Sequence, residues 1–197
     1  MSRVWIPAIE VESSSGTREV ALDTHHLMNR CIFLNGEITR ETAENFVSQF
    51  LFLQEQNEPI NIYINSPGGE VNAGLVIYDI IQGAKLPINM ICTGTAYSMA
   101  AILLAGGQKG RRYILPHSKV MIHEPLIANG VGGSATSVNN IAQSIMETRR
   151  ITNEILAKHT GKTVKEINKA TASDYYLNAE ESIKFGICDS ITTSLQV

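Results

Sequence analysis

The chain has 197 residues, of which 44% are hydrophobic and 18% charged, and its formal net charge is −3. This length predicts one globular domain with its own core, with or without an appendage. The lack of a basic run argues against nucleic acid as the main partner. Residues 1–12 lack the pattern of a signal peptide, and no apolar segment approaches membrane-spanning length. We therefore expect a soluble, cytoplasmic protein that does not act at a membrane.

The first half of the chain begins with a segment of little apparent periodicity and continues with alternating strands and helices. Residues 1–26, rich in serine near their middle, are typical of a mobile or partner-ordered arm. Buried strands are expected at 31–34, 60–64 and 88–92, and Thr39 is placed to cap the helix between the first two. Strands that alternate with helices predict βαβ units and a mainly parallel sheet.

The second half contains two short strand candidates between residues 112 and 123 and then a glycine-rich segment at 128–134. A long helix is expected from about 135 to 158, and two shorter helices begin at the capping-box residues Thr163 and Asn178. The long helix has an apolar stripe made of Val138, Ile141, Ile145, Ile151 and Ile155. A helix that projects from a small domain needs a partner to bury such a stripe.

The three cysteines, Cys31, Cys92 and Cys188, lie far apart in apolar, strand-like runs. Such cysteines are typical of a reduced intracellular core, and no pair has metal-ligand spacing with a histidine. We therefore expect neither a disulfide framework nor a metal site.

The stretch 94–104 joins the third strand to an uncharged helix and places Ser98 at the junction. In α/β proteins such a junction presents a nucleophile, because the turn lifts the hydroxyl clear of the sheet. The new helix also aims unpaired backbone N–H groups at whatever the serine attacks. The alternative is that Ser98 only caps the helix. This stretch alone supports both interpretations equally.

A nucleophilic serine needs a base, and the base needs an acid that orients it. His123 closes an apolar strand, and Asp174 precedes the last capped helix. A core histidine and a turn aspartate are the alternatives. The backbone N–H groups of Gly68 and Gly69 could form one half of an oxyanion hole and that of Met99 the other, or both glycines could serve only a tight turn before the helix. Together these residues predict acyl-transfer chemistry.

Four stretches of this chain resemble the Clp proteolytic subunit (ClpP) family of serine peptidases. They are residues 62–69, 97–99, 120–123 and 185–189, and they occur in the family's order and at nearly its spacing. The resemblance extends over nearly the whole chain. It implies that the reaction is hydrolysis of peptide bonds through an acyl-enzyme.

The resemblance assigns a role to each candidate residue. Ser98 is implied as the nucleophile, His123 as the general base and Asp174 as the acid that orients it. The N–H groups of Gly68 and Met99 are implied as the oxyanion hole. All three triad residue types are present, which separates the chain from family members that have lost a catalytic residue.

The implied fold is α/β, a crotonase/ClpP-like repeated βαβ spiral with a protruding helical handle. In the implied domain organisation, residues 1–26 form an N-terminal axial arm, and residues 27–126 and 160–197 form the head. Residues 127–159 form an inserted glycine-rich strand, which aligns substrate peptides, and the handle helix.

The resemblance also implies partners. Seven subunits form a ring, and two rings stack through their handles around a chamber that receives unfolded polypeptides. Tyr63 is implied to lie near clefts that receive loops of a hexameric AAA+ unfoldase. The unfoldase uses ATP, whereas this chain has no GxxxxGK[ST] motif, so we expect no cofactor in the chain itself.

The chain departs from the family pattern at several positions near the triad. Ala100 and Glu124 replace a common glycine and glutamine, and the glycine-rich segment is longer and begins with residues 127–128. Ala172 and Ser173 stand where an Asp-Arg pair often bridges the rings. An alternative is therefore a weakly active subunit that needs a sister subunit or an unfoldase to align its triad.

We rank an acyl-CoA enzyme on the same fold lower, and a binding-only module last, because neither explains all three triad residue types.

Overall fold

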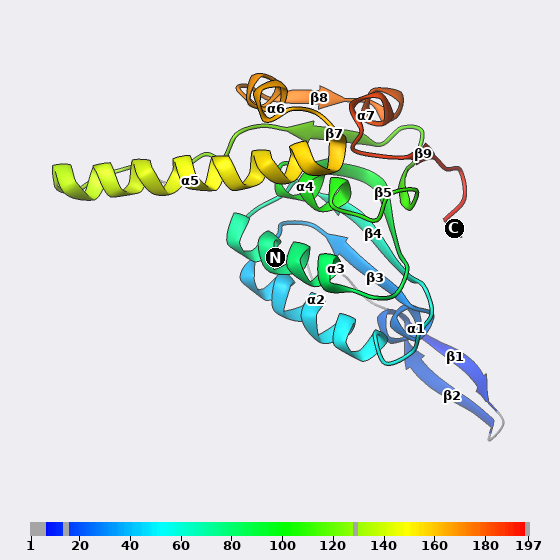
Figure 1. The fold of residues 1–197 in the computed structure, drawn as a ribbon. Coiled ribbons are helices and arrows are strands. Elements are labelled where there is room, and N and C mark those ends of the chain that lie inside the picture. Colours follow the sequence, from blue (N-terminus) through cyan, green and yellow to red (C-terminus); the bar gives the residue numbers. More distant parts are fainter. Residues whose placement is uncertain (1–6, 14–15, 128–129, 196–197) are drawn as a thin grey trace.

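A computed structural model describes residues 7–13, 16–127 and 130–195. Within these residues the chain forms a mixed sheet, a separate two-stranded hairpin and seven helices. One of the helices, α5, projects from one side of the body, and the hairpin β1–β2 projects from another (Figure 1). The elements are β1 (Ala8–Ser13), β2 (Gly16–Ala21), α1 (Leu22–Met28), β3 (Cys31–Asn35), α2 (Arg40–Leu53), β4 (Ile60–Ser66), α3 (Val71–Gly83), β5 (Ile88–Tyr97), α4 (Met99–Ala105), β6 (Arg112–Ile114), β7 (Lys119–Ile122), α5 (Ala135–Thr160), α6 (Val164–Ala170), β8 (Tyr175–Leu177), α7 (Ala179–Phe185) and β9 (Ser190–Ile191).

The sheet is mostly parallel, as the alternation of strands and helices predicted. Its order is β3-β4-β5-β6-β9, and β7 pairs with both β5 and β8. All pairs except β7–β8 are parallel. Strand β5 is longer than the predicted 88–92, so its first half pairs with β6 and its second half with β7. The extra residues of β5 carry the chain to Ser98.

The core lies between this sheet and the helices that connect its strands. Ile60, Ile62 and Ile64 of β4 are fully buried, and Phe46 and Phe50 of α2 pack in the same core cluster. The predicted cap of α2 is present, since the Thr39 side chain accepts a hydrogen bond from the Thr42 N–H. The predicted capping boxes of α6 and α7 are also present. Apolar burial and helix capping thus both stabilise the helices and strands that the sequence predicted.

The N-terminal segment has more regular structure than we expected. Strands β1 and β2 form an antiparallel hairpin, and α1 follows β2 directly and extends beyond residue 26. The interpretation of 1–26 as a segment of little periodicity was therefore wrong. Ile9 and Val11 are half-buried between exposed neighbours, so a strand alternation was present in the sequence. The implied role as an axial arm stays a prediction.

The expected glycine-rich strand is not formed by the residues that the structure describes between β7 and α5. Residues 123–127 and 130–134 belong to no ladder, and 128–129 lie outside the described residues. A strand is stable only with a neighbour that pairs with its backbone, and none of the strands in the described part of the chain pairs with these residues. Helix α5 starts at the predicted residue 135 and continues to Thr160.

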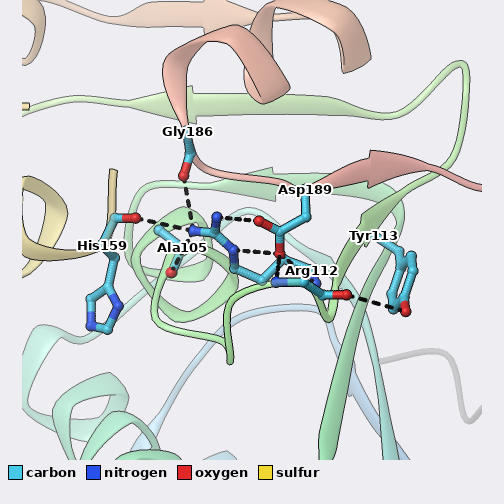
Figure 2. Close-up of polar contacts among 7 residues, drawn as sticks. Ala105, Arg112, Tyr113, His159, Gly186 and Asp189 are labelled. Carbon is cyan, nitrogen blue, oxygen red and sulfur yellow. Dashed lines mark hydrogen bonds and ion pairs between the residues drawn. The ribbon is translucent and has the colours of Figure 1, made fainter. Parts of the chain in front are cut away.

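One buried ion pair fastens the ends of three helices to the sheet (Figure 2). Arg112 of β6 donates to both carboxylate oxygens of Asp189, at 2.9 Å from Nε and 2.6 Å from Nη2. Its Nη1 also contacts three carbonyl oxygens at the C-terminal ends of α4, α5 and α7, namely those of Ala105, His159 and Gly186, at 3.1, 3.3 and 2.8 Å. A cation is favourable at helix C-termini because the unpaired carbonyl groups there carry partial negative charge.

Asp189 is held as a carboxylate at this junction. Besides the hydrogen bonds from the Arg112 side chain, its carboxylate accepts hydrogen bonds from the backbone N–H groups of Gly110 and Arg112. Burial acts to raise the pKa of Asp189, but the hydrogen bonds and charge of Arg112 outweigh it and hold the pKa below its usual value. The junction fixes the far end of α4, the helix that begins immediately after Ser98.

Candidate active site

Ser98 lies at a sharp turn between β5 and α4. Its backbone has φ 53° and ψ −122°, a conformation that non-glycine residues rarely adopt. Its N–H donates to the Met121 carbonyl at 2.8 Å, which ties the turn to β7, and every residue of α4 is buried. The Ser98 side chain makes no capping hydrogen bond. The structure therefore does not support the interpretation that Ser98 serves only as a cap.

His123 follows β7 and lies beside Ser98 because of strand register. The parallel β5–β7 ladder pairs Tyr97 with Met121, so the two strands end side by side. The His123 Nε2 lies 2.8 Å from the Ser98 Oγ, within hydrogen-bond distance. The imidazole is only 15% exposed. The structure thus brings the predicted nucleophile and the predicted base into contact.

Asp174 is placed by the single antiparallel ladder of the sheet. The β7–β8 register pairs Ile122 with Tyr175, so the next position brings Asp174 opposite His123. The Asp174 Oδ1 lies 3.3 Å from the His123 Nδ1, and the Asp174 side chain is 55% exposed. His123 therefore lies between a hydroxyl and a carboxylate, the arrangement that makes an imidazole a general base.

Two aromatic rings brace this set of residues. The rings of Tyr97 and Tyr176 meet edge to face with 5.7 Å between their centroids. Tyr97 precedes Ser98, and Tyr176 follows Asp174 by two residues. The contact therefore connects the segment of the predicted nucleophile with the segment of the predicted acid.

Gly68 lies against the nucleophile, and only glycine fits there. Its φ is +92°, and a Cβ at this position would lie 2.7 Å from the Ser98 Cβ and 3.0 Å from the Met99 nitrogen. Met99 is the first residue of α4, so its N–H has no partner carbonyl within the helix. The Gly68 N–H, in contrast, donates to the Ser66 Oγ at 3.1 Å. To bind an oxyanion, the Gly68 N–H would have to donate to the oxyanion and the Ser66 hydroxyl together, or to the oxyanion in place of the hydroxyl.

The chain contains further positioning residues that the sequence reasoning missed. A Cβ at Gly74 of α3 would overlap the Met99 side chain, so this glycine makes room for the residue after Ser98. Arg112 and Asp189, which fix the end of α4, were also missed, because 77 residues separate them and neither has a local signal. For Gly74 the sequence did offer a hint, because a glycine inside a helical segment often marks a close contact.

The cysteines are poor alternatives as nucleophiles. Cys92 and Cys188 are buried, and burial raises the pKa of both thiols, that of Cys92 to about 11. Burial also raises the pKa of Cys31. Because the thiolate is the reactive form, a raised pKa makes these thiols less reactive near neutral pH.

The described residues offer neither a metal-binding cluster nor a membrane-spanning helix. No three His, Cys, Asp or Glu side chains gather in a way that could hold a metal ion. No helix there has the length and apolar character needed to cross a membrane.

A comparison with protein families gives one match over nearly the whole chain. The model of the Clp protease family matches residues 14–195. The match contains all five residues of the candidate site and both residues of the buried ion pair that fixes α4.

Proposed function

We propose that this chain, which belongs to the Clp protease family, is the proteolytic subunit of an ATP-dependent Clp protease. It is a serine endopeptidase that hydrolyses unfolded proteins and short peptides through an acyl-enzyme. The observation that carries the proposal is the His123 ring, whose two nitrogens lie at 2.8 Å from the Ser98 Oγ and 3.3 Å from the Asp174 Oδ1.

The geometry supports the following sequence of steps. The Ser98 Oγ attacks the scissile carbonyl carbon while the His123 Nε2 takes its proton, and the Nδ1–H donates to Asp174. The carbonyl oxygen becomes an oxyanion that accepts hydrogen bonds from the backbone N–H groups of Met99 and Gly68. The Gly68 N–H gives up its hydrogen bond to the Ser66 hydroxyl to do so. His123 then protonates the leaving amine. Water, deprotonated by the same imidazole, hydrolyses the acyl-enzyme and regenerates Ser98.

The exposed apolar residues of α5 support assembly through this helix. Val138, Ile141 and Met146 are 41%, 37% and 57% exposed, and α5 projects away from the body (Figure 1). Burying such a stripe against a second copy removes apolar area from water. In our proposal seven subunits form a ring, and two rings stack through α5 in the cytoplasm.

A cleft lined by both aromatic and polar side chains supports an interaction with a hexameric AAA+ unfoldase. Phe33, Tyr63 and Leu195 are among the residues that line a cleft of about 960 Å³. The Phe33 and Tyr63 rings stack at 5.1 Å, and the Tyr63 hydroxyl donates to the Leu195 carbonyl. Loops of the unfoldase would bind here, and the unfoldase would hydrolyse the ATP.

The test is hydrolysis of a short fluorogenic peptide by the purified protein beside its Ser98→Ala variant. The proposal expects turnover by the parent protein and none by the variant at equal concentration and equal sedimentation coefficient. Turnover that persists unchanged in Ser98→Ala would assign the activity to another residue or to a contaminant.

A second candidate is a subunit whose activity depends on a sister subunit or an unfoldase. It is favoured by Asp174, which is 55% exposed, and by the exposed Ala172 and Ser173 before it, which offer no ion-pairing group to another chain. Analytical ultracentrifugation at low protein concentration distinguishes the two. A stable fourteen-mer with full peptidase activity would exclude this candidate.

A further inference from the structure

Glu124 connects the candidate base to the projecting helix. It follows His123 directly, and its carboxylate Oε2 lies 2.9 Å from the Nε of Arg149 on α5. This nitrogen is shielded from solvent, but its N–H is not aligned for a linear hydrogen bond, so the contact is an ion pair. The two side chains are 44% and 28% exposed, so solvent screens the pair only in part.

The backbone of Glu124 has a second anchor. Its N–H donates to the Thr171 carbonyl at 2.8 Å. Thr171 directly follows α6 as its C-cap, is fully buried and precedes Asp174 by three residues. Glu124 therefore touches the segment that carries the acid as well as the helix α5, and it does so from the position next to the base.

Arg149 lies at the place where α5 enters the body. The three buried residues of α5 are Thr152, Asn153 and Leu156, all C-terminal to it, whereas the part of the helix before Ile145 is exposed. Among the residues that the structure describes, Arg–carboxylate pairs join segments far apart in the sequence at two places, Arg112–Asp189 and Arg149–Glu124. The others lie within a single helix.

We propose that Glu124 and Arg149 form a positioning pair that holds His123 in line with Ser98 and Asp174 from the base of α5. The inference rests on the proposed peptidase activity. A shift of α5 moves Arg149, and the ion pair transmits that shift to the residue beside the imidazole. Neither residue touches the reacting atoms, so both act through the orientation of His123.

The experiment is a double-mutant cycle on the full chain with Glu124→Ala, Arg149→Ala and the double variant. Each single change lowers kcat about tenfold and leaves KM within about twofold, since small displacements of a catalytic group cost up to about 10²-fold. The two single variants and the double variant all lose the same interaction. The kcat of the double variant is therefore no lower than that of either single variant. Arg149→Lys keeps the charge and retains most of the activity.

A second readout separates positioning from a loss of folding or assembly. The rate of Ser98 labelling by a serine-directed phosphonate falls with kcat, while melting temperature and sedimentation coefficient stay those of the parent protein. Arg40→Ala is the matched control, because it removes a 2.8 Å ion pair with Glu44 on the exposed face of α2. This control leaves kcat unchanged.

The outcomes distinguish the two proposals. If the parent protein shows no Ser98-dependent peptidase activity alone or with an unfoldase, the proposed function fails. If the parent protein is active but either single variant keeps kcat within twofold of the parent value, the proposed positioning role is wrong and the proposed function stands. The same holds if the losses of kcat in the two single variants multiply in the double variant.

Discussion

Replacing Asp189 by asparagine would remove the charge of one partner from the buried Arg112–Asp189 pair while keeping its shape. The Arg112 side chain is 4% exposed and the Asp189 side chain 16%, so the remaining guanidinium would have little access to water. Asparagine keeps one carbonyl oxygen for Arg112. It cannot reproduce a carboxylate that accepts from Nε, Nη2 and two backbone N–H groups together.

The expected loss of stability follows from this arrangement. Breaking a buried ion pair costs about 3–5 kcal/mol, because the other charge stays buried without compensation. The lower end applies here, since three backbone carbonyls still accept from Arg112. With a urea dependence of about 2 kcal/mol per M, a loss of about 3 kcal/mol lowers the unfolding midpoint by about 1.5 M.

Urea unfolding followed by circular dichroism tests this, at one fixed protein concentration because assembly shifts apparent stability. Glu44→Gln, which alters the exposed Arg40–Glu44 pair, is the control and leaves the midpoint unchanged. A midpoint for Asp189→Asn within about 0.3 M of the parent protein, at an equal m-value, would show that the charge of Asp189 contributes little to stability.

The same pair predicts a pH dependence with a definite sign. The folded pKa of Asp189 lies below its usual value, so the stabilisation by its carboxylate is complete above the unfolded pKa and is lost as pH falls through the folded pKa. The stability difference between the parent protein and Asp189→Asn is therefore largest near neutral pH and narrows only in acid. A difference that stays constant down to acid unfolding would contradict this assignment.

Three further changes test the site and the assembly. Asp174→Asn lowers kcat about 10²- to 10⁴-fold in the peptide assay with little change in KM, because the imidazole loses its orienting acceptor; an unchanged kcat would remove Asp174 from the triad. Gly68→Ala places a Cβ against Ser98 and the Met99 nitrogen, and it lowers kcat about 10²-fold or more; full activity at an unchanged melting temperature would show that this close approach is not needed. Ile141→Glu puts a charge in the apolar stripe of α5, so sedimentation velocity should show a smaller assembly than that of the parent protein; an unchanged sedimentation coefficient would place the interface elsewhere.

The features of the fold that could be predicted are those with a local signal. The apolar runs at β3, β4 and β5 and the helical spacing of α2 and α5 appear at the expected places. The caps at Thr39, Thr163 and Asn178 each depend on residues three positions apart, so they too could be identified from the sequence. The hairpin β1–β2 was missed because its alternation is short and most of its residues are exposed.

The geometry of the candidate site depends on contacts that the sequence does not show locally. Asp174 faces His123 only because β8 pairs with β7 in an antiparallel register, which no local pattern fixes. The hydrogen bond from the Gly68 N–H to Ser66 is a detail of one turn, and Arg112 was interpreted only as the start of a strand. Long-range polar contacts of this kind follow from the packing of the whole chain.

Covalent labelling of the purified protein by a serine-directed phosphonate, followed by peptide mass mapping, tests most directly whether His123 activates Ser98 as a nucleophile. We expect one adduct per chain, at Ser98, that is absent from Ser98→Ala and forms much more slowly in His123→Ala. No adduct at Ser98 with or without an unfoldase, or equal labelling rates in the parent protein and His123→Ala, would contradict the claim that His123 activates Ser98 as a nucleophile.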